Sequence, residues 1–143
     1  MTRFTRARIW AAIQRWFRPR PLGKRGEALA ARYLKRKGYK IVGRGEQTGR
    51  GELDLIAVDG RTIVFVEVKT RQSHEMGIPA DAVDAEKQRK LTRCALTYLK
   101  RHDLLEHASR FDVVAVTWPD GKPPEIQHYQ NAFEATGSGQ MFV

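Results

Sequence analysis

Two apolar runs joined by an Asp-Gly pair constrain this chain more than any other feature of its sequence. The runs lie within residues 51–69, and each is long enough to form a buried strand. Asp59-Gly60 between them is typical of a two-residue β-hairpin turn. Asp54 interrupts the first run and Glu67 the second, although a buried carboxylate is costly unless it is paired or binds a metal. The hairpin therefore predicts a chemical site as well as a fold.

The register of this hairpin predicts which side chains meet. With Asp59-Gly60 as the loop, Asp54 lies opposite Phe65. Glu67 is then a diagonal neighbour of Asp54, at roughly 7–8 Å between Cα atoms. We expect one face to carry Asp54, Ile56, Val58, Ile63, Phe65, Glu67 and Lys69, and the other to carry Leu53, Leu55, Ala57, Val64, Val66 and Val68. Because both faces are largely apolar, the hairpin should lie within a sheet that helices cover on both sides.

The patterns around the hairpin predict an α/β sandwich, with a central mixed β-sheet flanked by α-helices. The expected elements are a helix over 26–37 closed by Gly38, a short strand over 39–42, a glycine-rich loop over 43–51, a helix capped by Asp81 or Asp84 and running to about 101, a strand over 111–116 and a short strand over 126–129. Residues 1–22 are predicted to be a basic amphipathic extension, 23–136 one domain and 137–143 a tail. For the extension, a poorly ordered or docked helix, membrane-surface attachment and phosphate contacts all stay open.

The net charge of +10 favours nucleic acid as a partner without establishing it. Residues 1–20 hold six arginines and no acid, so they carry +6 and leave only +4 for the remainder. The single cysteine excludes a disulfide framework, and the four histidines do not have zinc-ligand spacing. No apolar run is long enough to cross a membrane, and the N-terminus lacks the pattern of a secretion signal. We therefore predict a cytoplasmic protein.

Asp54, Glu67 and Lys69 are the predicted catalytic residues. Carboxylate oxygens suit Mg²⁺ or Mn²⁺, and the carbonyl of Val68 is a further predicted ligand. Such a cation would polarise the scissile phosphate and activate water, while Lys69 would orient that water or balance charge. Glu27 is predicted to point at the sheet as an outer ligand through water. A Glu in a first helical turn also suits the helix macrodipole and needs no other purpose.

Contacts with nucleic acid are predicted for side chains near the hairpin and on the second helix: Arg50, Arg71, Lys87, Gln88 and Arg89. The basic members would track a phosphate backbone. Gln88 shares a helical stripe with Leu91 and would project toward the carboxylates. Solvation of an exposed helix face is the simpler explanation for the three residues on the helix.

These residues resemble those of the YraN-like family, small uncharacterised bacterial proteins in the restriction-endonuclease-like PD-(D/E)xK superfamily. The matching stretches are 26–28, 51–56, 66–71, 110–114 and 131–133. The superfamily motif appears as Asp54 and Glu67-Val68-Lys69, with Leu53 in place of the motif proline. Glu27 is similar to the helix carboxylate of Holliday-junction-resolvase-like members. The resemblance implies a nuclease fold and, by analogy with resolvases, a homodimer.

The leading hypothesis is a Mg²⁺-dependent endonuclease-like protein that acts on phosphodiester bonds of DNA, in branched or single-stranded form. The alternative is a non-catalytic nucleic-acid-binding or assembly module that keeps the nuclease fold. A membrane-associated adaptor that uses residues 1–20 is a third possibility. The first predicts cleavage that needs Asp54 and a divalent metal, whereas the second predicts salt-sensitive binding that needs neither.

Overall fold

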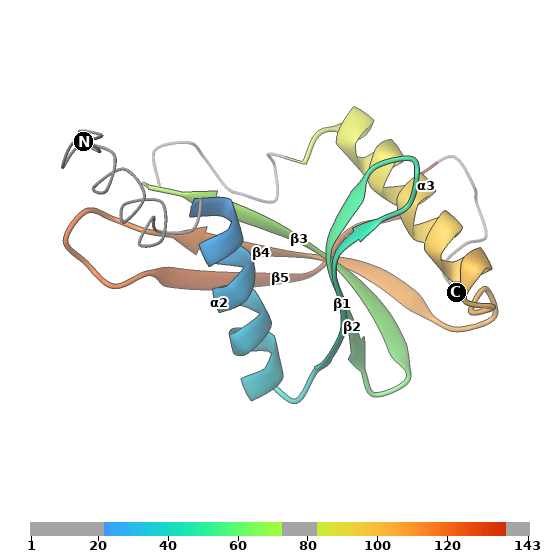
Figure 1. The fold of residues 1–143 in the computed structure, drawn as a ribbon, viewed down its shortest axis with the longest axis horizontal. Coiled ribbons are helices and arrows are strands. Elements are labelled where there is room, and N and C mark those ends of the chain that lie inside the picture. The colour runs from blue at the N-terminus through green and yellow to red at the C-terminus, as the bar shows by residue number, and fades with distance from the viewer. Residues whose placement is uncertain (1–21, 73–82, 137–143) are drawn as a thin grey trace, which may run out of the picture.

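The computed structural model describes residues 22–72 and 83–136, which form a five-stranded mixed sheet between two helices (Figure 1). In chain order the elements are α2 (Leu22–Arg36), β1 (Lys40–Gln47), β2 (Glu52–Asp59), β3 (Thr62–Arg71), α3 (Ala85–Arg101), β4 (Ser109–Thr117) and β5 (Glu125–Phe133). The strands lie side by side in sequence order, with β3 and β4 parallel and the other described neighbours antiparallel. The parallel pair needs a crossover, and α3 provides it. The predicted α/β sandwich is confirmed.

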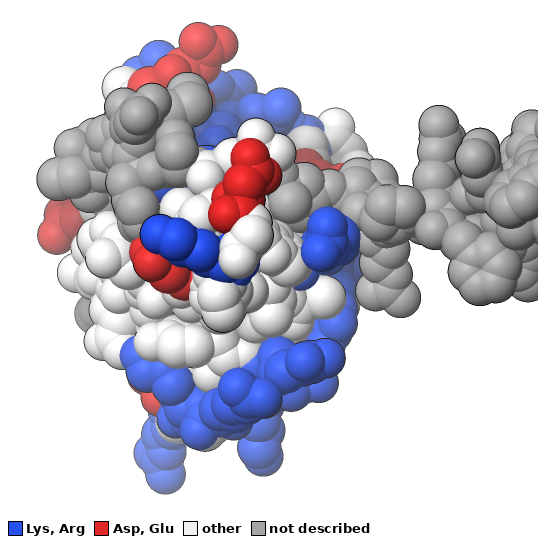
Figure 2. Space-filling model, turned by 90° about the vertical axis from the view of Figure 1, so that its left-hand side faces the viewer, with Lys and Arg blue, Asp and Glu red and all other residues white. Residues whose placement is uncertain are grey.

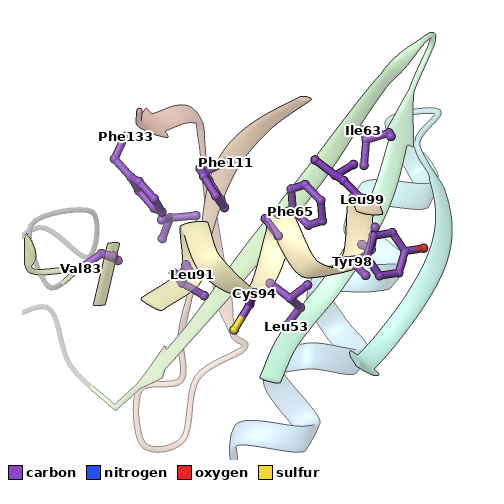
Figure 3. Packing of buried hydrophobic residues seen from close by; sticks show 13 residues of the cluster. Leu53, Ile63, Phe65, Val83, Leu91, Cys94, Tyr98, Leu99, Phe111 and Phe133 are labelled. Carbon is purple, nitrogen blue, oxygen red and sulfur yellow. The ribbon is translucent and has the colours of Figure 1, made fainter. Parts of the chain in front are cut away.

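The two helices cover opposite faces of the sheet through separate apolar clusters. The cluster beneath α2 includes Leu34, Leu55 and Val64. The cluster beneath α3 includes Leu91 and Leu99 of the helix and a row of aromatic rings from three strands (Figure 3). Burial of the central strands on both faces explains why their sequences are nearly continuous apolar runs.

The C-terminus of α2 and the N-terminus of α3 are formed as the sequence predicts. α2 starts at Leu22 rather than at residue 26, and it closes in a Schellman motif. In this motif the N–H of Tyr39 donates to the Leu34 carbonyl at 3.0 Å, and Gly38 takes a φ of +96° that favours glycine. At the start of α3 the N-cap is Asp84, whose carboxylate accepts the N–H of Lys87 at 2.8 Å. No helix among the described residues is long and apolar enough to span a bilayer.

The β2–β3 hairpin is present, but its predicted register is wrong. Gly60 and Arg61 form the two-residue connection, and Ile56 rather than Asp54 pairs with Phe65. Gly60 has a φ of +61° at the first central position, as in a type II′ turn. The register moves by two residues, an even number, so most side chains keep the face predicted for them.

Leu53 is the exception, because it lies on the opposite face from the one predicted. It packs in the cluster beneath α3, whereas Leu55 packs in the cluster beneath α2. The alternation of β2 therefore breaks at Asp54, just beyond the last pair of the β2–β3 ladder. There the Asp54 carboxylate, instead of a backbone carbonyl, accepts the N–H of Val68 at 2.9 Å.

The two edge strands are longer than predicted. β1 continues to Gln47, so part of the predicted loop over 43–51 is strand. Between Ile41 and Gly43 the register shifts, because β1 has one residue more there than the facing part of β2. β5 continues to Phe133, past the predicted end at 129. Residues 1–21 of the predicted extension over 1–22, the alternative cap Asp81 and the predicted tail over 137–143 lie outside the described residues, and Leu22 belongs to α2.

Candidate metal centre

Four acidic side chains from three elements meet near the start of α2. Glu27 comes from α2, Glu52 and Asp54 come from β2, and Glu67 comes from β3. One oxygen from each of Glu27, Glu52 and Asp54 lies within 4.8 Å of the other two. The carboxylate of Asp54 also interacts electrostatically with the carboxyl of Glu67. We call these four residues the acidic centre.

Backbone contacts position the members of the acidic centre close to one another. The Val68 amide, next to Glu67, donates to Asp54 and so joins the ends of β2 and β3. Gly26 is buried, and a side chain there would overlap Oγ1 of Thr70 on β3. Because Gly26 has no side chain, the first turns of α2 approach β3 closely and Glu27 reaches the carboxylates of β2.

Two lysines from different elements face Glu67. Lys87 Nζ of α3 lies 3.4 Å from Glu67 Oε1, and Lys69 Nζ of β3 lies 3.8 Å from the same oxygen. The Glu67 side chain is 7% exposed, whereas each lysine is 36% exposed. Lys69 thus lies beside the carboxylates, as predicted. Lys87, predicted only as a phosphate contact, lies even closer to Glu67.

The electrostatics of the acidic centre suit a bound cation. Burial and the charge of Asp54 raise the pKa of Glu67 to about 7, even though two lysines oppose the shift. Burial and the two β2 carboxylates also raise the pKa of Glu27. A divalent cation among these oxygens would relieve their repulsion, and Mg²⁺ and Mn²⁺ prefer such hard donors. The oxygens of Glu27, Glu52 and Asp54 therefore fit a divalent metal, whereas the pairing of Asp54 with Glu67 as its ligands stays a prediction.

Replacing Glu67 with glutamine is expected to stabilise the metal-free protein at pH 8. Below about pH 4.5 this carboxyl is protonated in the folded and unfolded chains alike. Between pH 4.5 and 7 the folded chain holds the proton more tightly, so the free energy of unfolding falls as the pH rises. Glu67→Gln removes this penalty, which is at most about 3.5 kcal/mol at ~1.4 kcal/mol per pKa unit.

Urea unfolding in EDTA at pH 4.5 and pH 8 measures this difference, with Glu106→Gln at an exposed position as the control. The Glu67 variant should gain stability only at the higher pH, and the control should change little at either. An equal gain at both values would contradict a protonation-linked cause.

The residues predicted to contact nucleic acid have different neighbours in the structure. The side-chain amide of Gln88 donates to the Val83 carbonyl at 2.9 Å, so it helps to close the start of α3. Arg71 Nε donates to Thr117 Oγ1 at 3.2 Å. Arg50 and Arg89 are exposed. Their contacts with nucleic acid remain predictions.

A basic surface runs along the exposed side of α2. Its exposed cations are Lys24, Arg25, Arg32, Lys35 and Arg36. Figure 2 shows lysine and arginine side chains gathered in a band along the lower part of one face, at the level where α2 ends in Figure 1. Such a surface suits a phosphate backbone, and the sequence interpretation did not include it.

Sequence reasoning also missed Glu52 as a member of the acidic centre. Glu52 lies two residues before Asp54, a spacing that directs both side chains to one side of a strand. Glu52 is exposed at the start of β2, where an acidic side chain is ordinary. Gln47 Nε2 donates to Glu52 Oε2 at 2.8 Å, which orients the carboxylate from the neighbouring strand.

Comparison with known proteins places the acidic centre in a defined family. Residues 26–116 match the family described as Uncharacterised protein family UPF0102, and this range contains the whole acidic centre. UPF0102 protein RB9115 of Rhodopirellula baltica is 51% identical over 125 residues, which cover 85% of this chain and 75% of that protein. A UPF0102 protein of Geobacter metallireducens is 49% identical over 113 residues, which cover 79% of this chain and 92% of that protein.

Proposed function

The chain belongs to the uncharacterised protein family UPF0102, the YraN-like family, and we propose that it is a divalent-metal-dependent nuclease acting on the phosphodiester bonds of DNA. The acidic centre supports this proposal most directly, because it joins four carboxylates to a neighbouring lysine. Hydrolysis of a phosphodiester needs charge stabilisation around the phosphate and a positioned water. The basic surface along α2 supports a polyanionic substrate.

Each residue of the centre has a defined part in this proposal. Asp54 and Glu67 would hold Mg²⁺ or Mn²⁺, with Glu27 and Glu52 as additional oxygen donors. When bound, the cation supplies Lewis-acid stabilisation of the phosphate and lowers the pKa of a bound water. The Lys69 ammonium would donate to that water or to a phosphate oxygen. Lys87 would turn from Glu67 to a phosphate once the carboxylate binds the metal.

Asp54→Ala is expected to abolish metal-dependent cleavage. The test incubates the full chain with labelled duplex, single-stranded and four-way-junction DNA, with Mg²⁺, Mn²⁺ or EDTA. Loss of the carboxylate removes a ligand of the cation and the acceptor of the Val68 amide, so cleavage should fall by at least ~100-fold. Glu106→Gln serves as an active control. Cleavage that survives Asp54→Ala or the addition of EDTA would overturn the proposal.

Thermal unfolding tests metal binding separately from turnover. Mg²⁺ or Mn²⁺ should raise the Tm of the wild type. At a concentration of 100 times its Kd, the ion adds about 2.7 kcal/mol to the free energy of unfolding. The same ions should leave the Tm of Asp54→Ala nearly unchanged. DNA binding without metal-induced stabilisation and without cleavage would instead favour the non-catalytic binding module.

A further inference from the structure

A cavity lies at the end of β4, outside the acidic centre. It has a volume of about 400 Å³, and it is lined by Arg25, Gln72 and the turn over 118–122. Pockets for small molecules occupy roughly 300–1,000 Å³, so this cavity can hold a single nucleotide unit. None of the residues that line it belongs to the acidic centre.

An aromatic ring and a guanidinium form one wall of the cavity. Arg25 Cζ lies 4.2 Å from the centroid of the Trp118 ring. Trp118 is half-buried against the apolar cluster beneath α2, and its backbone N–H donates to the Arg71 carbonyl at 2.7 Å. The pair is therefore anchored to both β3 and α2. Nucleobases stack on aromatic rings and on guanidinium planes.

The charges at this end of α2 suit an anionic ligand. Lys24 and Arg25 lie near the start of the helix, and its first turn contains no acid. The helix macrodipole already makes this end positive, so two cations here oppose the usual preference. The contact with Trp118 stabilises Arg25 only in part. An arrangement that is locally unfavourable is expected where function requires it, and a nearby phosphate would make it favourable.

The cavity lies within reach of a strand bound at the acidic centre. Arg71, which holds Trp118, is four residues beyond Glu67 on β3, or about 13 Å at ~3.3 Å per residue. On α2, Arg25 is two residues before Glu27. About four stacked nucleotides cover this distance at ~3.4 Å each, and an extended strand needs fewer.

Resting on the nuclease function, we propose that this cavity binds an unpaired nucleobase of the strand whose phosphate lies in the acidic centre. The base stacks on the Arg25–Trp118 pair while Lys24 attracts the backbone. A base inside a duplex is already paired and stacked, so only an unpaired or flipped base can enter. The cavity thus selects DNA that carries single-stranded nucleotides beside the scissile bond.

Trp118 fluorescence tests this subsite without any need for cleavage. The chain has three tryptophans, and Trp10→Phe with Trp16→Phe leaves Trp118 as the sole tryptophan, which excitation at the long-wavelength edge of its absorption band selects over tyrosine. In EDTA, a 20-nucleotide single strand should quench its fluorescence, whereas a blunt duplex of equal length should quench it little. Absence of quenching by the single strand at concentrations that saturate binding would overturn the subsite.

A pair of matched variants on α2 separates stacking from charge. Arg25→Ala and Arg32→Ala each remove one exposed cation, but only the first removes half of the stacked pair. By fluorescence anisotropy, Arg25→Ala should weaken single-strand binding roughly 5- to 150-fold, the equivalent of ~1–3 kcal/mol per stacked base. Arg32→Ala should weaken single-strand and duplex binding alike, and by less.

Further variants keep the result interpretable. Trp118→Phe retains a ring and should keep most single-strand affinity, whereas Trp118→Ala should lose it, with circular dichroism confirming that both fold. Equal effects of Arg25→Ala and Arg32→Ala would also overturn the subsite. Duplex cleavage that depends on Asp54 but not on Trp118 would leave the nuclease function intact. Quenching by single strands without any cleavage would instead remove the nuclease function.

Discussion

Asp112→Ala is expected to lower the free energy of unfolding by about 3–5 kcal/mol. The Asp112 side chain is fully buried and accepts hydrogen bonds from three residues. Arg110 Nε donates at 3.0 Å, His128 Nε2 at 2.7 Å and the Asn131 amide at 2.9 Å. Truncation leaves these donors without their acceptor inside the sheet, and loss of a buried charge partner is among the costliest single changes.

A second partner of Arg110 provides the matched control. Asp59 Oδ2 lies 3.1 Å from Arg110 Nη2, but the Asp59 side chain is 42% exposed. Asp59→Asn should therefore cost no more than about 1 kcal/mol. Urea unfolding at pH 7 compares the two variants. If Asp112→Ala costs as little as Asp59→Asn, the buried network does not stabilise the sheet as inferred.

The cost of Asp112→Ala should also depend on pH. Burial acts to raise the pKa of Asp112, but hydrogen bonds from His128, Arg110 and the Asn131 amide outweigh it and set the pKa below its ordinary 3.8. A lowered folded-state pKa stabilises the protein above the unfolded value, and this contribution is lost as pH falls through the folded value. The difference in the free energy of unfolding between the wild type and Asp112→Ala should become smaller below about pH 4.

The hairpin shows how much of the site the sequence can predict. Side chains two apart along a strand share a face, and a turn of even length keeps the faces of both strands. Asp54 and Glu67 were therefore expected together despite an error of two residues in the register. The alternation of side chains along each strand was sufficient to predict this pair. The residues of the turn could not be predicted in this way, because they depend on the φ of Gly60, which is a property of the folded backbone.

Contacts between distant segments could not be predicted in the same way. Lys87 pairs with Glu67 across a stretch outside the described residues, and His128 pairs with Asp112 through the register of β4 and β5. No local periodicity specifies either distance. The placement of Leu53 failed for a related reason, because the side-chain contact of Asp54 with the Val68 amide breaks the alternation of β2.

Gly26→Ala is expected to reduce DNA cleavage about 100-fold and to destabilise the fold by about 1–3 kcal/mol. A methyl group at Gly26 would overlap Thr70 Oγ1 and lie 3.1 Å from Thr70 Cβ. The first turns of α2 must then move away from β3. Glu27 follows the helix and leaves the carboxylates of β2, and a displacement of ~1 Å is enough for a loss of this size. Cleavage assays and urea unfolding give the two measurements.

Gly23 of the same helix is the control, because a methyl group there meets no atom within 4 Å among the described residues. Gly23→Ala should keep full activity and gain up to ~1 kcal/mol from helix propensity. Thr70 Oγ1 is buried without a hydrogen-bond partner in the described part of the chain, so Thr70→Ala forfeits no bond. Added to Gly26→Ala, it removes the overlap with Oγ1 and leaves the 3.1 Å contact with Cβ, so it should restore most of the activity and stability. If it restores neither, overlap with Thr70 is not what positions Glu27.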